Sequence, residues 1–348
     1  IIATPPDTHE EIINYAIKYG KHIFCEKPCS LSFEKVKKIL KKIEKKKKFI
    51  SHMVNFELIE IDAFKYFRNH IKKNKTKIHS INVEWNIFDR SQLTSWKNFH
   101  SKGGGLIFNY LCHSLYYLEK IFGKITYINC LTEFKLNKKN KSIEVLLRIK
   151  KNIFCTISIN SNKNLGKKQL FHKLFIATNE GNFQLKSKTI NISDRFNLEK
   201  FFLIKEKLIK KKIFYEKRNS QDFRISPSCY NFKKFAASIE RKKIANPSFI
   251  DAKNIHLLIK KIVQSSKKNK KLIAVASSLG RTHPVFAIWN MSLRVKLKIS
   301  LNNGVRKIDQ FTENFNPSVV YFEDKHDPFF NINTPEDIKL AEKIMLSY

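Results

Sequence analysis

Apolar runs and amphipathic segments alternate at the start of the chain. Ile1–Thr4 and His22–Cys25 are short apolar runs, and the apolar positions of His9–Tyr19 have helical spacing. Gly20 follows this segment as a helix C-terminal signal, and Phe33–Lys46 repeats the helical spacing. Strands that alternate with helices in this way predict a parallel sheet with crossover helices.

The middle of the chain changes to short alternating runs separated by polar turns. Such runs predict strands joined by hairpins, and hence a mainly antiparallel sheet. One predicted helix, Leu106–Phe122, interrupts them. From about Asn197 to Lys271 the spacing predicts helices, most clearly over Asn231–Arg241 and Ala252–Ser266. The expected strands are Ile78–Ile87, Ile125–Phe134, Ile143–Ile149, Ile153–Ile159, Lys173–Ala177 and Asn182–Leu185.

A second, smaller α/β pattern follows a lysine-rich stretch that ends at Lys271. Its expected elements are strand Ile273–Ser277, helix Asn290–Asn302, strand Val319–Phe322 and helix Pro335–Leu346. We therefore expect an α/β chain in three parts. These are a partial parallel-sheet domain over residues 1–55, an α+β domain with a mainly antiparallel open sheet over 56–272, and a small α/β fragment over 273–348.

Basic residues outnumber acidic ones, and the formal net charge is +37 over 348 residues. Such an excess favours a polyanion partner, but the lysines accompany a surplus of Ile, Asn and Phe, as AT-rich codons produce. Lysine clusters such as Lys45–Lys48 and Lys210–Lys212 lie far apart in the sequence and lack interleaved aromatic residues. We therefore expect no nucleic-acid partner. An anionic substrate would still benefit from this charge.

The 6 cysteines form no C-x-x-C pair and show no metal-ligand spacing. Neither a metal site nor a disulfide scaffold is therefore expected. Reduced thiols, no signal peptide and no apolar run approaching about 18 residues predict a cytoplasmic protein without a membrane partner. Residue 1 is Ile, so we expect the sequence to start inside a reading frame or after processing.

Glu26-Lys27-Pro28 follows a predicted parallel strand. Ligands bind at the carboxyl ends of strands in open α/β sheets. Partial desolvation at this position would lower the pKa of Lys27 toward the range useful for proton transfer. The alternative is a solvated lysine in a lysine-rich chain.

A second group of residues comprises Gly103-Gly104-Gly105, Asn109 and His113. The glycines allow a close backbone approach. Asn109 and His113 are four apart on one predicted helix, so we expect them to share a face. A histidine with an ordinary pKa of about 6.5 suits proton exchange with a hydroxyl. A structural histidine on an amphipathic helix is the alternative.

Four motifs, ATPPDTH, CEKP, SWK and GGGLIFNYLCH, occur in this order. In order and spacing they resemble the glucose–fructose oxidoreductase/inositol dehydrogenase family (Gfo/Idh/MocA) over about residues 1–272. The resemblance implies a nicotinamide-dependent oxidoreductase with a Rossmann-type domain, NAD or NADP as cofactor, and a homo-oligomer formed through the antiparallel sheet. It implies catalytic roles for Lys27, His113 and Asn109. The implied cofactor contacts are Thr4, Pro5, His9, Glu26, Lys27, Asn55, Trp96 and Lys97.

In the implied reaction, His113 or Lys27 removes the proton of a secondary hydroxyl while hydride moves to the nicotinamide. Lys27 also stabilises the developing oxyanion. The substrate would be a sugar, polyol or sugar nucleotide, and the cationic charge favours a sugar nucleotide.

The chain departs from the family pattern in three places. Asn109 replaces the usual Asp, as in similar members thought to act on sugar nucleotides, and Tyr116 replaces a second frequent Asp. The G-x-G-x-x-G turn, its strand and the acidic ribose-binding residue are not in the sequence. We therefore expect these 348 residues to bind NAD(P) poorly or not at all. The residue that separates NAD from NADP is in the same missing segment.

The tail carries a different resemblance. AVASSLGRTHPVFAIWN, NNGVRK and DPFFNINTPEDIKLAE resemble the last third of molybdenum cofactor guanylyltransferase (MobA-like nucleotidyltransferases) over about residues 273–348. The resemblance implies GTP and Mg²⁺ near Asn331 and Asn333, whereas a turn and helix cap before Pro335 is the local alternative. The triphosphate-binding loop of that family is not in the sequence, so the tail alone should not transfer guanylyl groups.

Three hypotheses follow. The leading one is an oxidoreductase impaired by truncation and joined in frame, near Lys271, to the end of a guanylyltransferase. The second is a nucleotidyltransferase, which binding of GTP and Mg²⁺ would distinguish from the first. The third is a non-catalytic oligomerising remnant, in which Lys27→Ala and His113→Ala would leave any measured turnover unchanged.

Overall fold

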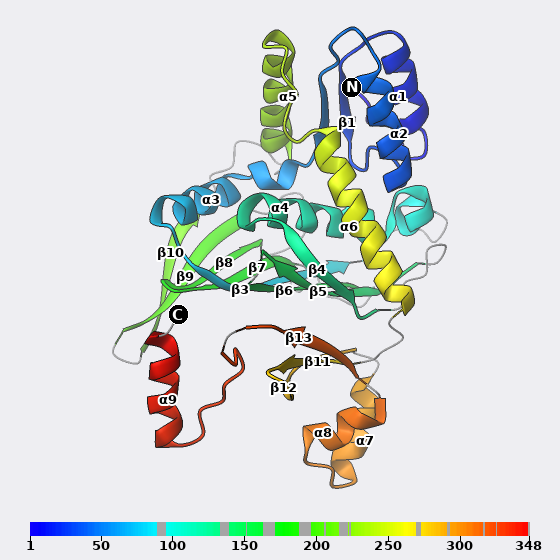
Figure 1. Ribbon diagram of the computed structural model, residues 1–348. Helices are drawn as coiled ribbons and strands as arrows, with labels where there is room; N and C mark the ends of the chain where they lie inside the picture. The colour runs from blue at the N-terminus through cyan, green and yellow to red at the C-terminus, as the bar shows by residue number, and fades with distance from the viewer. Residues whose placement is uncertain are drawn as a thin grey trace. The chain divides into compact units, whose positions relative to one another are not determined.

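Two parallel strands form the first sheet of the computed structural model, sheet A (Figure 1). Strand β1 (Ile23–Glu26) pairs in register with β2 (His52–Asn55), and Ile2 forms a parallel bridge with Cys25. Helices α1 (His9–Lys18) and α2 (Phe33–Glu44) make the crossovers, as their apolar spacing predicts. The buried side chains of α2 recur at three- and four-residue intervals, so one stripe faces the sheet. The predicted partial Rossmann-type sheet is confirmed.

The structure describes most of the 348 residues. The described ranges are 1–88, 95–132, 139–150, 152–162, 171–187, 196–204, 207–215, 222, 224–268, 273–290, 293–315, 317–324 and 326–346. Predicted features at Phe134, Lys138 and Lys271 lie outside these ranges.

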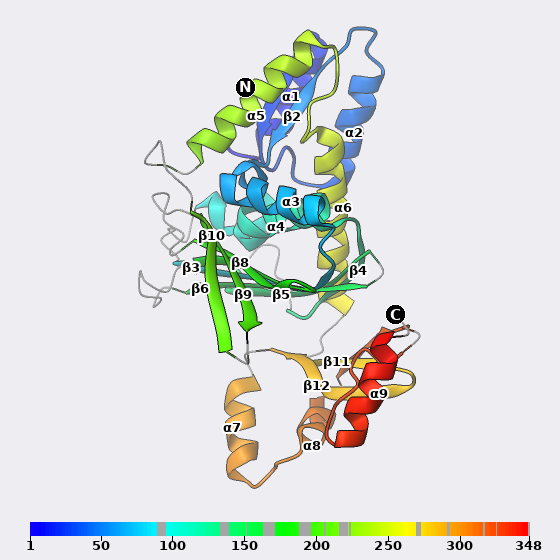
Figure 2. The same ribbon diagram turned by 90° about the vertical axis from the view of Figure 1, so that its left-hand side faces the viewer.

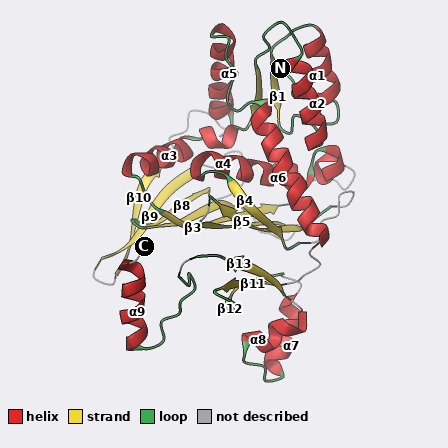
Figure 3. Cartoon of the chain, viewed as in Figure 1, coloured by secondary structure: helices red, strands yellow, loops and turns green. Residues whose placement is uncertain are grey.

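An eight-stranded open sheet, sheet B, forms the second layer (Figures 1 and 3). Its order is β10-β9-β8-β7-β3-β6-β5-β4, and every neighbouring pair is antiparallel except β3 and β6. The predicted antiparallel open sheet is thus confirmed. The strands are β3 (Ile78–Phe88), β4 (Ile125–Cys130), β5 (Ser142–Ile149), β6 (Ile153–Asn162), β7 (Phe171–Thr178), β8 (Gly181–Ser187), β9 (Phe196–Ile204) and β10 (Lys207–Tyr215).

Helices cover one face of sheet B, as Figures 1 and 2 show from two directions. The strands alternate buried and half-buried side chains, which is the pattern of a sheet with one face in the core. The helices around this core are η1 (Glu57–Glu60), α3 (Asp62–Asn74), η2 (Trp96–Asn98), η3 (His100–Lys102), the π-helix Ile107–Leu111, α4 (Cys112–Phe122), α5 (Ile225–Glu240) and α6 (Phe249–Lys268).

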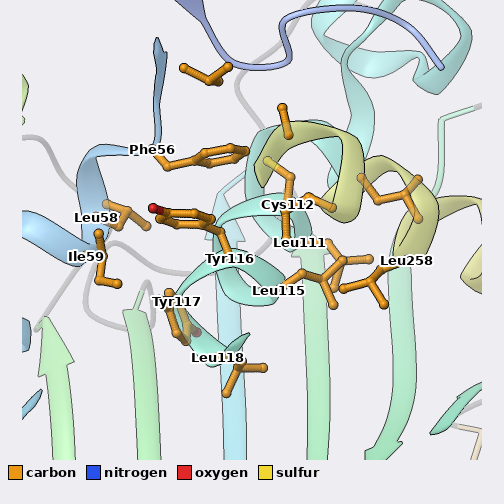
Figure 4. Close-up of a cluster of buried hydrophobic side chains, with 14 of the residues drawn as sticks. Phe56, Leu58, Ile59, Leu111, Cys112, Leu115, Tyr116, Tyr117, Leu118 and Leu258 are labelled. Atoms are coloured by element: carbon orange, nitrogen blue, oxygen red, sulfur yellow. The ribbon is translucent and has the colours of Figure 1, made fainter. Parts of the chain in front are cut away.

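One hydrophobic core joins sheet A, the helices and sheet B. Figure 4 shows the part of it where Phe56 and Tyr116 lie face to face, and their ring centroids are 4.5 Å apart. Three leucines belong to the same core: Leu111 of the π-helix, Leu115 of α4 and Leu258 of α6. Because this core is continuous, residues 1–55 and the following α+β region belong to one compact unit, which comprises Ile1–Cys130 and Phe134–Lys267.

The helical prediction over residues 197–215 is wrong, because β9 and β10 occupy this stretch. These strands pair antiparallel with each other, and β9 also pairs with β8. Runs of Phe, Ile and Lys have no clear two-residue period at a sheet edge, so their apolar positions mimic a helical pattern. Helix α3 was not predicted, although Ala63, Phe64 and Phe67 form its buried face.

The second unit comprises Lys268–Tyr348 with Leu131–Glu133. Its three-stranded sheet C has the order β12-β11-β13, and β11 pairs antiparallel with β12 and parallel with β13. Buried Ile273, Val275, Leu293 and Phe311 form its small core. Its elements are β11 (Ile273–Ser278), β12 (Arg281–Trp289), α7 (Arg294–Asn302), α8 (Ile308–Thr312), η7 (Glu313–Phe315), β13 (Ser318–Phe322) and α9 (Pro335–Leu346).

None of the helices among the described residues combines the length and the apolar character needed to cross a bilayer.

Candidate active site

The carboxyl ends of the parallel strands bring the first predicted site residues together. Glu26 ends β1 and Asn55 ends β2, and these two residues are register partners. The Asn55 side-chain amide donates to Glu26 Oε1 over 2.8 Å, and Asn231 Nδ2 donates to Asn55 Oδ1 over 3.1 Å. The Glu26 carboxylate is therefore held in place at the sheet edge where ligands bind in this class of fold.

His9 ties two loops of this edge together. Its Nε2 lies 2.8 Å from the Thr4 carbonyl oxygen and its Nδ1 lies 2.8 Å from the Pro28 carbonyl oxygen. The ring is 1% exposed, so His9 is a structural tie and does not present a nitrogen to solvent. Thr4 and Pro5 remain exposed on the loop that His9 holds, and Thr4 Oγ1 hydrogen bonds with Thr8 Oγ1 over 2.7 Å.

Lys27 reaches the one π-helical segment of the described chain, Ile107–Leu111. Its Nζ donates to the Phe108 carbonyl over 3.0 Å and to the Asn109 carbonyl over 3.2 Å. A π-helix shifts its hydrogen bonds by one residue and leaves carbonyls available to side chains, which is why such segments recur at functional sites. An ammonium has three N–H groups, so one remains for a ligand.

At the predicted glycines, the backbone lies close to other parts of the chain. A Cβ on Gly104 would lie 2.3 Å from the Trp96 carbonyl oxygen, and one on Gly103 would lie 2.5 Å from Pro6 Cβ. Asn109 Nδ2 donates to the Lys97 carbonyl over 2.8 Å. Trp96 and Lys97, in η2, are therefore packed directly against the glycines and the π-helix.

His113 lies deeper than Asn109. The imidazole is 5% exposed, and its Nε2 lies 4.0 Å from Glu57 Oε1. Burial lowers the pKa of His113 well below its ordinary value, and the charge of Lys27 acts in the same direction. Asn109 belongs to the π-helical segment and His113 to α4, so the shared face of these two residues stays a prediction.

A cavity of about 390 Å³ opens beside Lys27 and Asn109. His113 is not among the described residues that line the cavity. The charges of two lining residues, Lys27 and Arg224, nevertheless act on the buried side chains of His113 and Glu57. Arg224 is held by a two-pronged ion pair with Asp222, with contacts of 2.7–3.2 Å. The polar lining residues are Lys27, Lys97, Asn98, Asn109, Lys139, Asn140, Ser161 and Arg224.

Sequence reasoning missed Glu57, Lys139 and Arg224. Glu57 had a signal: it is an acid within the apolar run Phe56 to Ile59, just after the strand that ends at Asn55. Burial raises its pKa from the ordinary 4.5 to about 7. Arg224 and Lys139 lie in polar stretches without a local signal, and only the tertiary fold brings them to the cavity.

The predicted tail residues form a local turn. Asn331 Nδ2 donates to Asn333 Oδ1 over 3.2 Å, and Asp337 accepts the backbone N–H groups of Asn333 and Thr334. Both asparagines are exposed. The described residues contain no cluster of three or more His, Cys, Asp or Glu side chains placed to hold a metal ion.

Solved structures with the same fold include levoglucosan dehydrogenase in complex with NADH and levoglucosan. It is 18% identical, with a TM-score of 0.65, over 77% of this chain and 78% of that chain. The UDP-N-acetylglucosamine 3-dehydrogenase of Acidithiobacillus ferrooxidans is 10% identical, with a TM-score of 0.58, over 77% and 78% of the two chains. At these identities the similarity shows the fold alone.

Curated relatives match a shorter stretch. Molybdenum cofactor guanylyltransferase of Rhodopseudomonas palustris is 41% identical over 91 residues, which are 26% of this chain and 43% of that protein. The chain therefore spans less than half the length of this relative. The C-terminal piece resembles that protein, as expected.

Two family models match residues 1–55 and 71–275. Residues 1–55 match the NAD-binding Rossmann fold of an oxidoreductase family, and residues 71–275 match the C-terminal alpha/beta domain of the same family. The second match alone exceeds half of the chain. The two matches agree with the strand order of sheet B, with the position of Lys27 after β1, and with the fold of the solved dehydrogenases. The chain belongs to the Gfo/Idh/MocA oxidoreductase family.

Proposed function

We propose that the protein oxidises a secondary hydroxyl of a carbohydrate with NAD, or reduces the corresponding ketone with NADH. The observation that carries this proposal is Lys27, which follows β1 and lines the cavity. Its ammonium is held there by two carbonyls of the π-helix. Family membership and NADH-bound neighbours of the same fold support the cofactor. A non-catalytic remnant would have no need for an ammonium placed in this way.

The residues present fit one end of the cofactor. Glu26 is a fixed acceptor at the sheet edge, suited to the hydroxyls of the nicotinamide ribose, and Thr4 and Pro5 form the neighbouring loop. Trp96 and Lys97 would complete this side of the site.

The proposed chemistry divides between two residues. Lys27 binds the reacting oxygen with its remaining N–H and stabilises negative charge there. His113, neutral because burial lowers its pKa, takes the hydroxyl proton. Nε2 of this ring faces Glu57, and Nδ1 has no hydrogen-bond partner among the described residues. NAD supplies the hydride acceptor when it is bound.

The charge of the cavity selects the substrate class. Four cationic side chains, Lys27, Lys97, Lys139 and Arg224, line it, and no described Asp or Glu does. Neutral sugars would gain little from this field, whereas a phosphate or carboxylate would be attracted. We therefore propose a sugar nucleotide, as the overall charge also favours.

The test is turnover with NADH across a panel of oxidised sugar nucleotides, sugar acids and neutral sugars. Lys27→Met should lower kcat/KM at least 100-fold, because removing one donor to a developing oxyanion typically costs about 10²–10³. Lys38→Met, an exposed lysine on α2, is the matched control and should retain activity. Equal turnover in Lys27→Met and the wild type would refute the assignment.

We also propose that copies associate through sheet B. Its strands carry half-buried large side chains such as Phe154 and Phe175 at positions that alternate with the buried ones. Light scattering coupled to size exclusion should report a multimer. A monomer at micromolar concentration would contradict this proposal.

A further inference from the structure

The buried carboxyl of Glu57 is not explained by packing. Glu57 lies between Phe56 and Leu58 in the run that leads into η1, and it is only 7% exposed. Its Oε2 has no hydrogen-bond partner among the described residues. Leaving a buried polar group unsatisfied typically costs about 1–3 kcal/mol. A native protein retains such a group mainly where it has a function.

His113 faces Glu57 and also has a buried polar atom without a hydrogen-bond partner among the described residues. Its Nε2 is 4.0 Å from Glu57 Oε1, and its Nδ1 has no partner among the described residues. The Phe56 ring meets the imidazole edge to face, with centroids 6.2 Å apart, and limits its rotation. The two residues thus face each other through Nε2 and Oε1, and each has its other polar atom without a partner among the described residues.

Two cations and one carboxylate act on this pair. Lys27 and Arg224 act on both residues, Glu26 acts on Glu57, and His172, whose own pKa burial lowers to about 3, lies near His113. Desolvation dominates for both residues, raising the pKa of Glu57 to about 7 and lowering that of His113. Near neutral pH the pair thus holds a neutral imidazole beside a carboxyl that is partly ionised.

We propose that Glu57 is the positioning residue of His113, the acidic partner that Asn109 cannot be. This inference rests on the proposed function only for the role of His113. When the substrate O–H bond breaks, its proton goes to the His113 imidazole, and a bound NAD would accept the C–H hydride. Glu57 neither gains nor loses an atom in that step. Its ionised carboxylate orients the ring through Nε2 and stabilises the imidazolium.

The test is NMR titration of the His113 imidazole with ¹⁵N-labelled histidine, which needs no turnover. His113→Gln identifies the signal. In the wild type, the ring shifts should move with an inflection near pH 7, as Glu57 ionises. Glu57→Gln should remove this inflection. Glu60→Gln is the matched control in the same turn, because Glu60 pairs with Lys234 over 2.9 Å, and it should keep the inflection.

Unchanged His113 shifts in Glu57→Gln would overturn the proposal, as would wild-type shifts that stay flat between pH 6 and 8. If Glu57→Gln does not fold, the ¹³C signal of the wild-type Glu57 carboxyl decides: titration near 7 supports the proposal and titration near 4.5 overturns it. Loss of NADH binding with an intact inflection would refute only the proposed function. A wild-type protein that binds NADH but shows no inflection would refute only this inference.

Discussion

At the residue scale, the motifs singled out Lys27 and Asn109, which line the cavity, and Glu26 and Asn55, which hydrogen bond to each other. They could do so because strand ends and glycine turns are local features. Glu57 was missed because its importance lies in what surrounds it after folding. Its neighbours in sequence are apolar, but the histidine that it faces comes from another helix.

Gly104 provides a direct test of the packing beside the cavity. A Cβ there would meet the Trp96 carbonyl oxygen at 2.3 Å and the Lys97 backbone at 2.8 Å. Backbone atoms cannot move aside as a flexible side chain can. Gly104→Ala should therefore lower the free energy of unfolding by about 1–3 kcal/mol, measured by urea denaturation. Exposed Ser101→Ala should change it by less than about 0.5 kcal/mol. Equal stability of Gly104→Ala and the wild type would contradict the close approach.

At the element scale, alternation predicted the central strands of sheet B well, because each has one buried face. It did not predict β9 and β10, whose apolar and basic residues follow no clear two-residue period. The predicted helix Leu106–Phe122 contains a π-helical start that a 3.6-residue period cannot reveal. That irregular turn is the part of the helix that binds Lys27.

The start of α2 offers an element-scale prediction. The Ser32 side chain caps the helix by accepting from the Lys35 backbone N–H over 3.3 Å. Ser32→Ala leaves that donor unsatisfied and should destabilise the protein by about 1 kcal/mol. Urea unfolding measures the change. Ser32→Asp keeps an acceptor, so it should be close to the wild type, and a loss as large as that of Ser32→Ala would argue against the cap.

At the scale of the whole molecule, stability should fall with acid. Burial lowers the pKa of His52 and His100 to about 4 and of His172 and His256 to about 3. Between about pH 6.5 and 4 the unfolded chain binds protons that the folded chain does not. Each of these histidines therefore lowers the free energy of unfolding by at most about 1.4 kcal/mol for each unit by which the pH falls. Glu57 and Glu144, with raised pKa values of about 7, oppose this between pH 7 and 4.5, but they are fewer.

Urea unfolding at pH 7.5, 6 and 5 checks this prediction. The urea midpoint should decrease as the pH falls, most between pH 6 and 5, and His172→Phe should flatten this slope. This variant keeps a ring to stack on Trp85, where the centroids are 3.6 Å apart, but removes one titrating group. A midpoint that does not change with pH would mean that the buried histidines are not held neutral.

The central position of β3 has a consequence for biosynthesis. Its partners β6 and β7 begin only at Ile153 and Phe171, long after β3 has ended at Phe88. At about 5–20 residues per second, a ribosome needs several seconds to supply them. During that time Val83 and Trp85 have no sheet to enter. We expect the nascent chain to recruit a chaperone such as a ribosome-bound holdase in this interval, and cells depleted of such factors to accumulate this protein in inclusion bodies.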